Sequence, residues 1–69
     1  MTLNEKQFSE LRTKAEKNGW KASATDYGEG HIAHDFVKRH GAFTTCVFAT
    51  QSQKGRYEIY NAYYSELTK

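Results

Sequence analysis

The stretch from Phe43 to Tyr64 constrains the fold more than any other part of the chain. Its pattern predicts two β-strands joined by a tight turn at Ser52-Gln53-Lys54-Gly55, and it holds six of the ten aromatic residues and the single cysteine. Aliphatic side chains are few in these 69 residues. Aromatic rings must therefore supply much of the core, because each can bury roughly 150–250 Å². The question is which rings face inward.

The predicted turn fixes the register of this hairpin. If Gly55 takes the left-handed position of a three-residue loop, Gln53-Lys54-Gly55, then Ser52 lies opposite Arg56. Counting back places Ala49 opposite Ile59, and Phe48 opposite Tyr60. One face then carries Phe43, Thr45, Val47, Ala49, Tyr57, Ile59 and Tyr63, and the other carries Thr44, Cys46, Phe48, Thr50, Glu58, Tyr60, Ala62 and Tyr64. We expect the first face, which has the aliphatics, to be core, although a slip of one residue would reverse the assignment.

The N-terminal segment carries the signals of a helix at both ends. Asn4 is a good N-cap, and Gln7 stands three residues later, as a capping box requires. Leu3 and Phe8 occupy the two positions of a hydrophobic staple. At the other end, Gly19 suits the left-handed C′ position, with Trp20 packed back on the helix.

Two further strands and an ambiguous tail complete the predicted fold. Residues 20–27 and His31–Arg39 alternate with period two, and turns follow at Gly28-Glu29-Gly30 and Arg39-His40-Gly41-Ala42. The tail from Asn61, itself a possible N-cap, also shows helical spacing. We therefore predict a single α+β domain, residues 1–69, with the N-terminal helix packed on one face of a three- to four-stranded antiparallel sheet. The order is αββββ, or αβββα if the tail is helical.

Composition limits the class of protein. One cysteine permits no internal disulfide, which favours a reducing, cytoplasmic setting. The longest apolar run is three residues, so we expect neither a signal peptide nor a membrane span. The net charge is only +2, yet residues 36–57 contain four Lys and Arg side chains and no carboxylate: Lys38, Arg39, Lys54 and Arg56.

The sequence shows no decisive catalytic, metal or cofactor motif. His31 and His34 point to opposite faces if both lie on one strand, so together they make a poor metal site. Cys46 lies in the middle of a predicted strand, where burial would leave its thiol inert. Gly28-Glu29-Gly30 lacks the third glycine and the following helix of a phosphate-binding loop. We expect no metal and no cofactor.

The helix that ends in Lys-Asn-Gly-Trp, followed by the segment Gly28-Glu29-Gly30-His31-Ile32-Ala33-His34-Asp35-Phe36, resembles HicA toxins. The resemblance spans residues 8–36 and implies a small ribonuclease in which His31 or His34 acts as general base on an RNA 2′-hydroxyl. The chain departs from that family's pattern in three ways. No serine precedes the histidine, the two histidines are separated, and the Pro-His segment is missing.

The free face of the hairpin is the best candidate site. We expect a non-enzymatic protein that binds through this face, with a site made of Phe48, Tyr60, Tyr64, Lys38, Arg39, Lys54 and Arg56. A short chain without catalytic motifs suits an adaptor or inhibitor of the kind that phages and mobile elements often encode. Tyrosine, phenylalanine and arginine are typical of protein interfaces. The same side chains could instead stack on nucleic-acid bases and hold phosphates, or form a homodimer.

Overall fold

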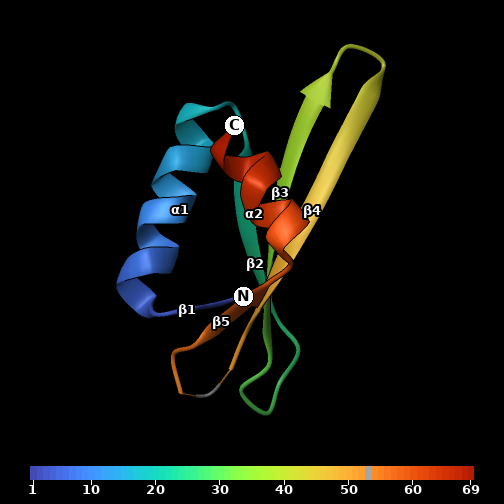
Figure 1. The fold of residues 1–69 in the computed structure, drawn as a ribbon. Helices are drawn as coiled ribbons and strands as arrows, with labels where there is room; N and C mark the ends of the chain where they lie inside the picture. Colours follow the sequence, from blue (N-terminus) through green and yellow to red (C-terminus); the bar gives the residue numbers. More distant parts are fainter. Residues whose placement is uncertain (53) are drawn as a thin grey trace.

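The computed structural model describes residues 1–52 and 54–69. Its elements are, in order, β1 (Thr2–Leu3), α1 (Glu5–Lys17), β2 (Lys21–Asp26), β3 (Ile32–His40), β4 (Phe43–Gln51), β5 (Tyr57–Ile59) and α2 (Asn61–Thr68). The predicted α+β class, with the N-terminal helix packed on an antiparallel sheet, is confirmed (Figure 1). The sheet has five strands rather than three or four, because a two-residue strand precedes α1, and the tail is helical.

The predicted signals at both ends of α1 are present. The Asn4 side chain accepts a hydrogen bond from the Gln7 amide at 2.8 Å, and the Gln7 side chain accepts one from the Asn4 amide at 2.9 Å. Gly19 has φ +95°, in the left-handed region, and the Trp20 amide donates to the Ala15 carbonyl at 3.0 Å. These bonds satisfy backbone groups that a helix end leaves without partners.

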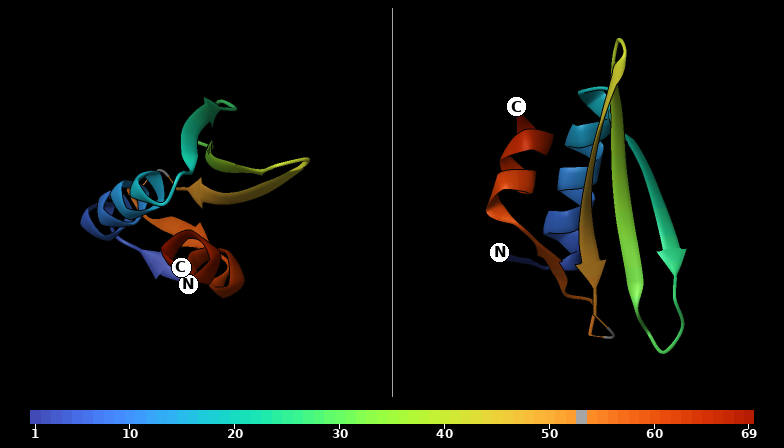
Figure 2. Two further views of the ribbon diagram at one scale, coloured as in Figure 1. Left: turned by 90° about the horizontal axis from the view of Figure 1, so that it is seen from above. Right: turned by 90° about the vertical axis from the view of Figure 1, so that its right-hand side faces the viewer.

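The strands follow the order β1-β5-β4-β3-β2, all antiparallel. The predicted register is confirmed along β5: Ala49 lies opposite Ile59, the Ser52 amide donates to the Arg56 carbonyl at 2.8 Å, and Gly55 has φ +69°. The ladder ends at Ile59, so the expected pairing of Phe48 with Tyr60 is not part of it. Gln53, part of the predicted loop, lies outside the described residues. The sheet curves, and α1 lies in its concave side with α2 beside α1 (Figure 2).

The core forms between α1 and the concave face of the sheet. Val47, Ala49 and Ile59 are each at most 4% exposed, as their predicted face requires, and Phe36 of β3 is fully buried beside Val47. Tyr57 is also buried, and its ring stacks on Phe8 with centroids 4.1 Å apart and planes within 3°. The buried side chains of the described residues are Leu3, Phe8, Leu11, Ala15, Trp20, Phe36, Val47, Ala49, Tyr57, Ile59 and Leu67.

The prediction that Phe43 belongs to the core is wrong, since Phe43 is 78% exposed. Phe43 does alternate in phase with Val47, but it stands at the start of β4, where β3 and β4 project past the ends of both helices (Figures 1 and 2). Thr45, between them on the same face, is half-buried. Alternation sets the side to which a residue points, whereas burial needs an element on that side.

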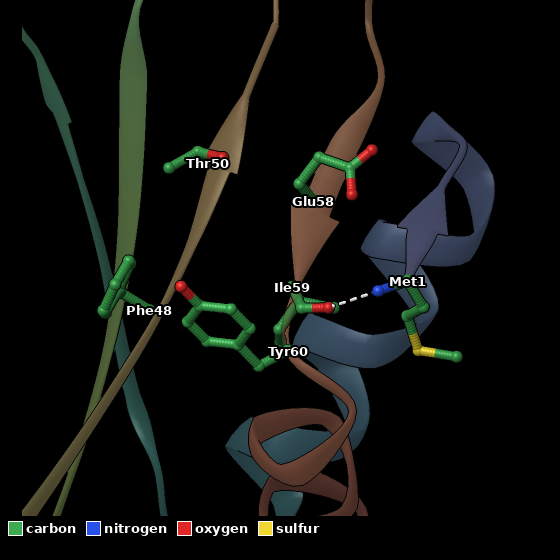
Figure 3. Close-up of a pocket in the computed structure, with 6 residues that line it drawn as sticks. All are labelled: Met1, Phe48, Thr50, Glu58, Ile59 and Tyr60. Atoms are coloured by element: carbon green, nitrogen blue, oxygen red, sulfur yellow. Dashed lines mark hydrogen bonds between the residues drawn. The ribbon is translucent and has the colours of Figure 1, made fainter.

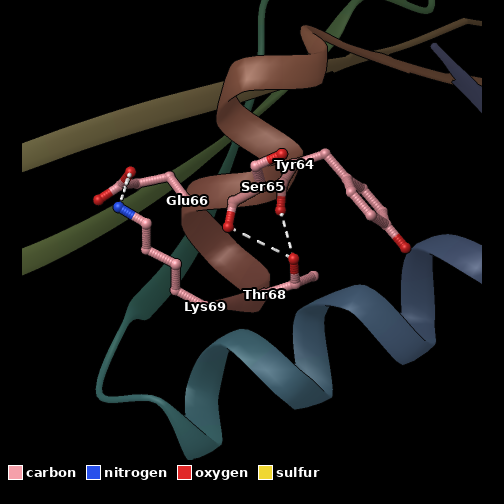
Figure 4. Close-up of polar contacts among 5 residues, drawn as sticks. All are labelled: Tyr64, Ser65, Glu66, Thr68 and Lys69. Atoms are coloured by element: carbon pink, nitrogen blue, oxygen red, sulfur yellow. Dashed lines mark hydrogen bonds and ion pairs between the residues drawn. The ribbon is translucent and has the colours of Figure 1, made fainter.

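The tail leaves the sheet one residue before the expected N-cap. Tyr60, rather than Asn61, is the N-cap of α2, and Leu67 on that helix is fully buried. Tyr63, expected on the core face of a strand, lies on α2, as do Ala62 and Tyr64, expected on the free face. In Figure 4 the Tyr64 ring points toward α1, and the Thr68 hydroxyl donates to the Tyr64 carbonyl at 3.0 Å. Within the described residues, neither helix is long and apolar enough to cross a bilayer.

Candidate binding face

The outer face of the sheet lies opposite α1. Its central strands place Ala33, Asp35, Val37 and Arg39 of β3 beside Thr50, Phe48, Cys46 and Thr44 of β4. Lys21, Ser23 and Thr25 of β2 lie on the same face, as does Glu58 of β5. Helix α1 lies on the opposite side of the sheet (Figure 2), whereas α2 reaches this face near Phe48 through Tyr63.

Three rings gather where β5 ends beside β4. Phe48 lies 6.3 Å from Tyr60 and 5.6 Å from Tyr63, and the two tyrosines lie 5.3 Å apart, all measured between ring centroids. Such tilted contacts are the favoured geometry for aromatic pairs. Phe48 is 43% exposed and Tyr60 66%, while Tyr63 packs partly against the core. We call Phe48, Tyr60 and Tyr63 the aromatic patch.

A shallow depression of about 300 Å³ adjoins the aromatic patch. Figure 3 shows its lining: Met1, Phe48, Thr50, Glu58, Ile59 and Tyr60. The Met1 amino group donates a hydrogen bond to the Ile59 carbonyl at 2.6 Å, which holds the N-terminus at the rim. Met1 is 49% exposed, so its flexible thioether adds adaptable apolar surface.

Two carboxylates flank the aromatic patch, together with the positively charged Met1 amino group that is hydrogen-bonded to Ile59. Asp35 is the cross-strand neighbour of Phe48, and Glu58 lines the depression. In an antiparallel ladder, directly opposed side chains have Cβ atoms roughly 4.5–5.5 Å apart. A phosphate placed over Phe48 would therefore be repelled by the nearby Asp35 carboxylate. A lysine or arginine of a partner would be attracted by the same carboxylate.

The structure does not bring the predicted site residues together. Arg39 lies opposite Thr44, whereas Arg56 follows the far end of β4, opposite Ser52. Eight residues of strand separate these levels, roughly 27 Å. Lys54 lies in the same turn as Arg56 and is exposed. The four cations therefore occupy two distant ends of the sheet.

Two of the predicted site residues face α1 rather than the outer face. The Lys38 ammonium lies 5.8 Å from the centre of the Trp20 ring, on the concave side of the sheet. Tyr64 lies on α2 and lines a groove with Leu11 and Lys14 of α1. Tyr63 takes the place expected for Tyr64 beside Phe48. A helical tail brings Tyr63 beside Tyr60, three residues earlier, and this spacing was the signal that could have identified Tyr63.

The residues considered for catalysis have different surroundings. His34 is half-buried, its Nε2 lies 2.8 Å from the Gln51 side-chain oxygen, and its ring lies 4.7 Å from that of Phe8. His31 is exposed in the loop before β3. Cys46, expected to be buried, is exposed on the outer face. Among all residues but Gln53, no three or more His, Cys, Asp or Glu side chains are grouped to hold a metal ion.

Comparison with known proteins gives no relative. No family model matches the chain, and neither a curated protein nor a solved structure resembles it significantly.

Proposed function

We propose that this chain is a small non-enzymatic binding protein, an adaptor or inhibitor that contacts a protein partner through the aromatic patch and the adjoining depression. The observation that carries the proposal is the exposure of Phe48 and Tyr60 in contact with each other on an open sheet face. Exposed aromatic rings that touch one another and border a depression are typical of the residues that dominate protein interfaces.

The surroundings of the aromatic patch favour a protein partner over nucleic acid. Asp35 and Glu58 flank the patch, and Arg39 and Arg56 lie toward opposite ends of the sheet. A protein can match this pattern with an apolar side chain in the depression and a lysine or arginine beside the carboxylates. We therefore expect a partner with an apolar anchor and a basic rim.

The setting completes the proposal. A single cysteine, exposed and free, suits a reducing compartment, and we place the protein in the cytoplasm. A phage or mobile element is a fitting source for so short a binding protein.

The same patch could pair two copies of the chain. Sedimentation at micromolar concentration separates the cases, since a stable dimer would show the patch to be a self-association surface.

The test is capture of a partner from nuclease-treated lysate by the wild type and by a Phe48→Ala, Tyr60→Ala double variant. We expect the double variant to lose at least about 30-fold in affinity, the equivalent of one interface hot spot of ~2 kcal/mol. Tyr27→Ala is the matched control, because Tyr27 is 71% exposed in the loop between β2 and β3. The control should bind normally.

Two results would count against the proposal. Equal capture by the wild type and the double variant would place the contact elsewhere. Loss of folding in the double variant, seen by circular dichroism, would show that the two rings support the structure. In that case Tyr60→Ser alone provides the binding measurement, because Tyr60 is the more exposed ring.

A further inference from the structure

The turn between β3 and β4 ends a projecting two-stranded ribbon. The last pair between β2 and β3 is Lys21 with Val37, and beyond it β3 and β4 continue for three more pairs: Lys38 with Thr45, Arg39 with Thr44, and His40 with Phe43. Three residues of strand extend roughly 10 Å. We call residues 38–45 the arm. It reaches past the ends of α1 and α2 in Figure 1 and in the right-hand view of Figure 2.

An aromatic ring stands at the tip of the arm. Phe43 is 78% exposed, more than any other large apolar side chain of the described residues. It occupies the last ladder pair before the turn, opposite His40. A phenyl ring exposed to water at the end of a two-stranded ribbon contributes little to the core. Its apolar faces are available for stacking on a flat ligand.

The arm is basic, unlike the aromatic patch. Lys38, Arg39 and His40 follow one another in β3, and residues 36–57 contain no carboxylate. Lys21 on β2 shares the outer face with Arg39, two residues along the neighbouring strand. Such diagonal neighbours lie roughly 7–8 Å apart. Asp35 is the nearest carboxylate on that face of the ladder, and Glu66 at the end of α2 pairs with Lys69 at 3.3 Å.

The two sides of the arm carry different groups. Strand alternation puts Phe43, His40 and Lys38 on the concave side, and Arg39 and Thr44 on the outer side. The Lys38 ammonium already makes a cation–π contact with the Trp20 ring, whereas the Arg39 side chain is exposed. Because Phe43 and Arg39 lie on opposite sides, a ligand that contacts both must cross the ribbon at its tip, with its flat group on Phe43 and its anionic groups on the side of Arg39.

We propose that the arm is a binding site for single-stranded nucleic acid, separate from the aromatic patch. One base stacks on Phe43, and the flanking phosphates contact Arg39 and the neighbouring Lys21 and Lys38. Unpaired bases suit this site because a single exposed ring among a few cations can stack on any base without reading a groove. An acidic peptide would satisfy the cations and leave the ring without a flat partner.

The experiment is fluorescence anisotropy with labelled oligo-dT and oligo-U of about 12 nucleotides, within the usual site size for such proteins. Phe43→Ala should weaken binding about 5- to 150-fold, the range found when a stacked aromatic is removed. Phe43→Leu should weaken it similarly, and Phe43→Trp should preserve it. The wild-type affinity should fall as salt rises, with a logarithmic slope of about −2 for three phosphate contacts on a single strand.

Arginine variants locate the site. Arg39→Gln should weaken binding and make the salt slope shallower by about 0.7. Arg56→Gln, an equal charge change at the far end of β4, is the matched control and should leave both unchanged. The Phe48→Ala, Tyr60→Ala double variant should bind the oligonucleotides normally. A failure of the aromatic patch proposal thus leaves the arm proposal intact, and the reverse also holds.

Several results would overturn the arm proposal. These are absence of oligonucleotide binding, equal loss in Arg39→Gln and Arg56→Gln, or full affinity in Phe43→Leu. Binding to vesicles of anionic lipid, with none to oligonucleotides, would assign the arm to a membrane surface instead. Phe43 and Arg39 are exposed, so their variants should fold, and circular dichroism verifies this.

Discussion

The two halves of β4 are built alike and behave differently. From Val47 to Gln51 the strand packs beneath α1 on one face, and Val47 and Ala49 are at most 3% exposed. From Phe43 to Cys46 the same alternation continues, yet Phe43 is 78% exposed. The helices end before the arm begins. A strand pattern therefore reports orientation, and the length of the covering helices decides burial.

The largest expected effect comes from removing a phenylalanine ring from each half of the β3–β4 hairpin in turn. Phe36, paired with Val47, is fully buried, so Phe36→Ala should lower the free energy of unfolding by ~3–5 kcal/mol through lost burial and a cavity. Phe43→Ala should change it by no more than about 0.5 kcal/mol. Urea denaturation measures both. A loss above about 1 kcal/mol for Phe43→Ala would mean that the arm packs against the body.

A smaller effect should follow from exchanging hydroxyl and methyl groups along β4. Val47→Thr places a hydroxyl in the core and should cost ~1–3 kcal/mol of unfolding free energy. Thr45→Val, two residues earlier on the same face and at the base of the arm, should be neutral within about 0.5 kcal/mol because Thr45 is only half-buried. Thermal denaturation ranks the pair, and equal costs would show that both sites are core.

The smallest expected effect concerns the base of the arm. Lys38→Gln removes the ammonium beside the Trp20 ring and should cost ~0.5–1 kcal/mol. Amide exchange at Lys38 and Thr45 should become faster, because alternation along the ladder makes them the first hydrogen-bonded pair of the arm and the Trp20 contact holds that pair to the body. Hydrogen exchange by NMR gives both readouts. Unchanged exchange in the arm, with unchanged stability, would remove Lys38 from this role.

Local signals in the sequence predicted most of the fold. Asn4, Gln7 and Gly19 determine the ends of α1 through contacts with residues close to them in the sequence. These ends could therefore be identified without tertiary information. The register of Ala49 opposite Ile59 followed from the turn and Gly55 alone. Strand β1 could not be recognised, because a two-residue strand has no period and exists only through its pairing with β5.

The site was only partly predictable. The outward direction of Phe48 and Tyr60 followed from register, and their exposure bears this out. The positions of Tyr64 and Lys38 depend on how α2 and α1 pack, which no local pattern specifies. Arg39 and Arg56 belong to the same carboxylate-free segment of the sequence, which suggested one basic site. Strand β4 lies between them and places them at opposite ends of the sheet. The arm exists because the pairing of β2 with β3 begins at Lys21 and Val37, while β3 continues to His40.

The position of Cys46 has a practical consequence. It is the only thiol in the chain and lies on the outer face, two residues from Phe48 and two from Thr44. A maleimide dye attached there would label every molecule at one known point without any engineered residue. From that point, changes in fluorescence would report ligands arriving at the aromatic patch and at the arm, so one labelled sample could follow both in real time.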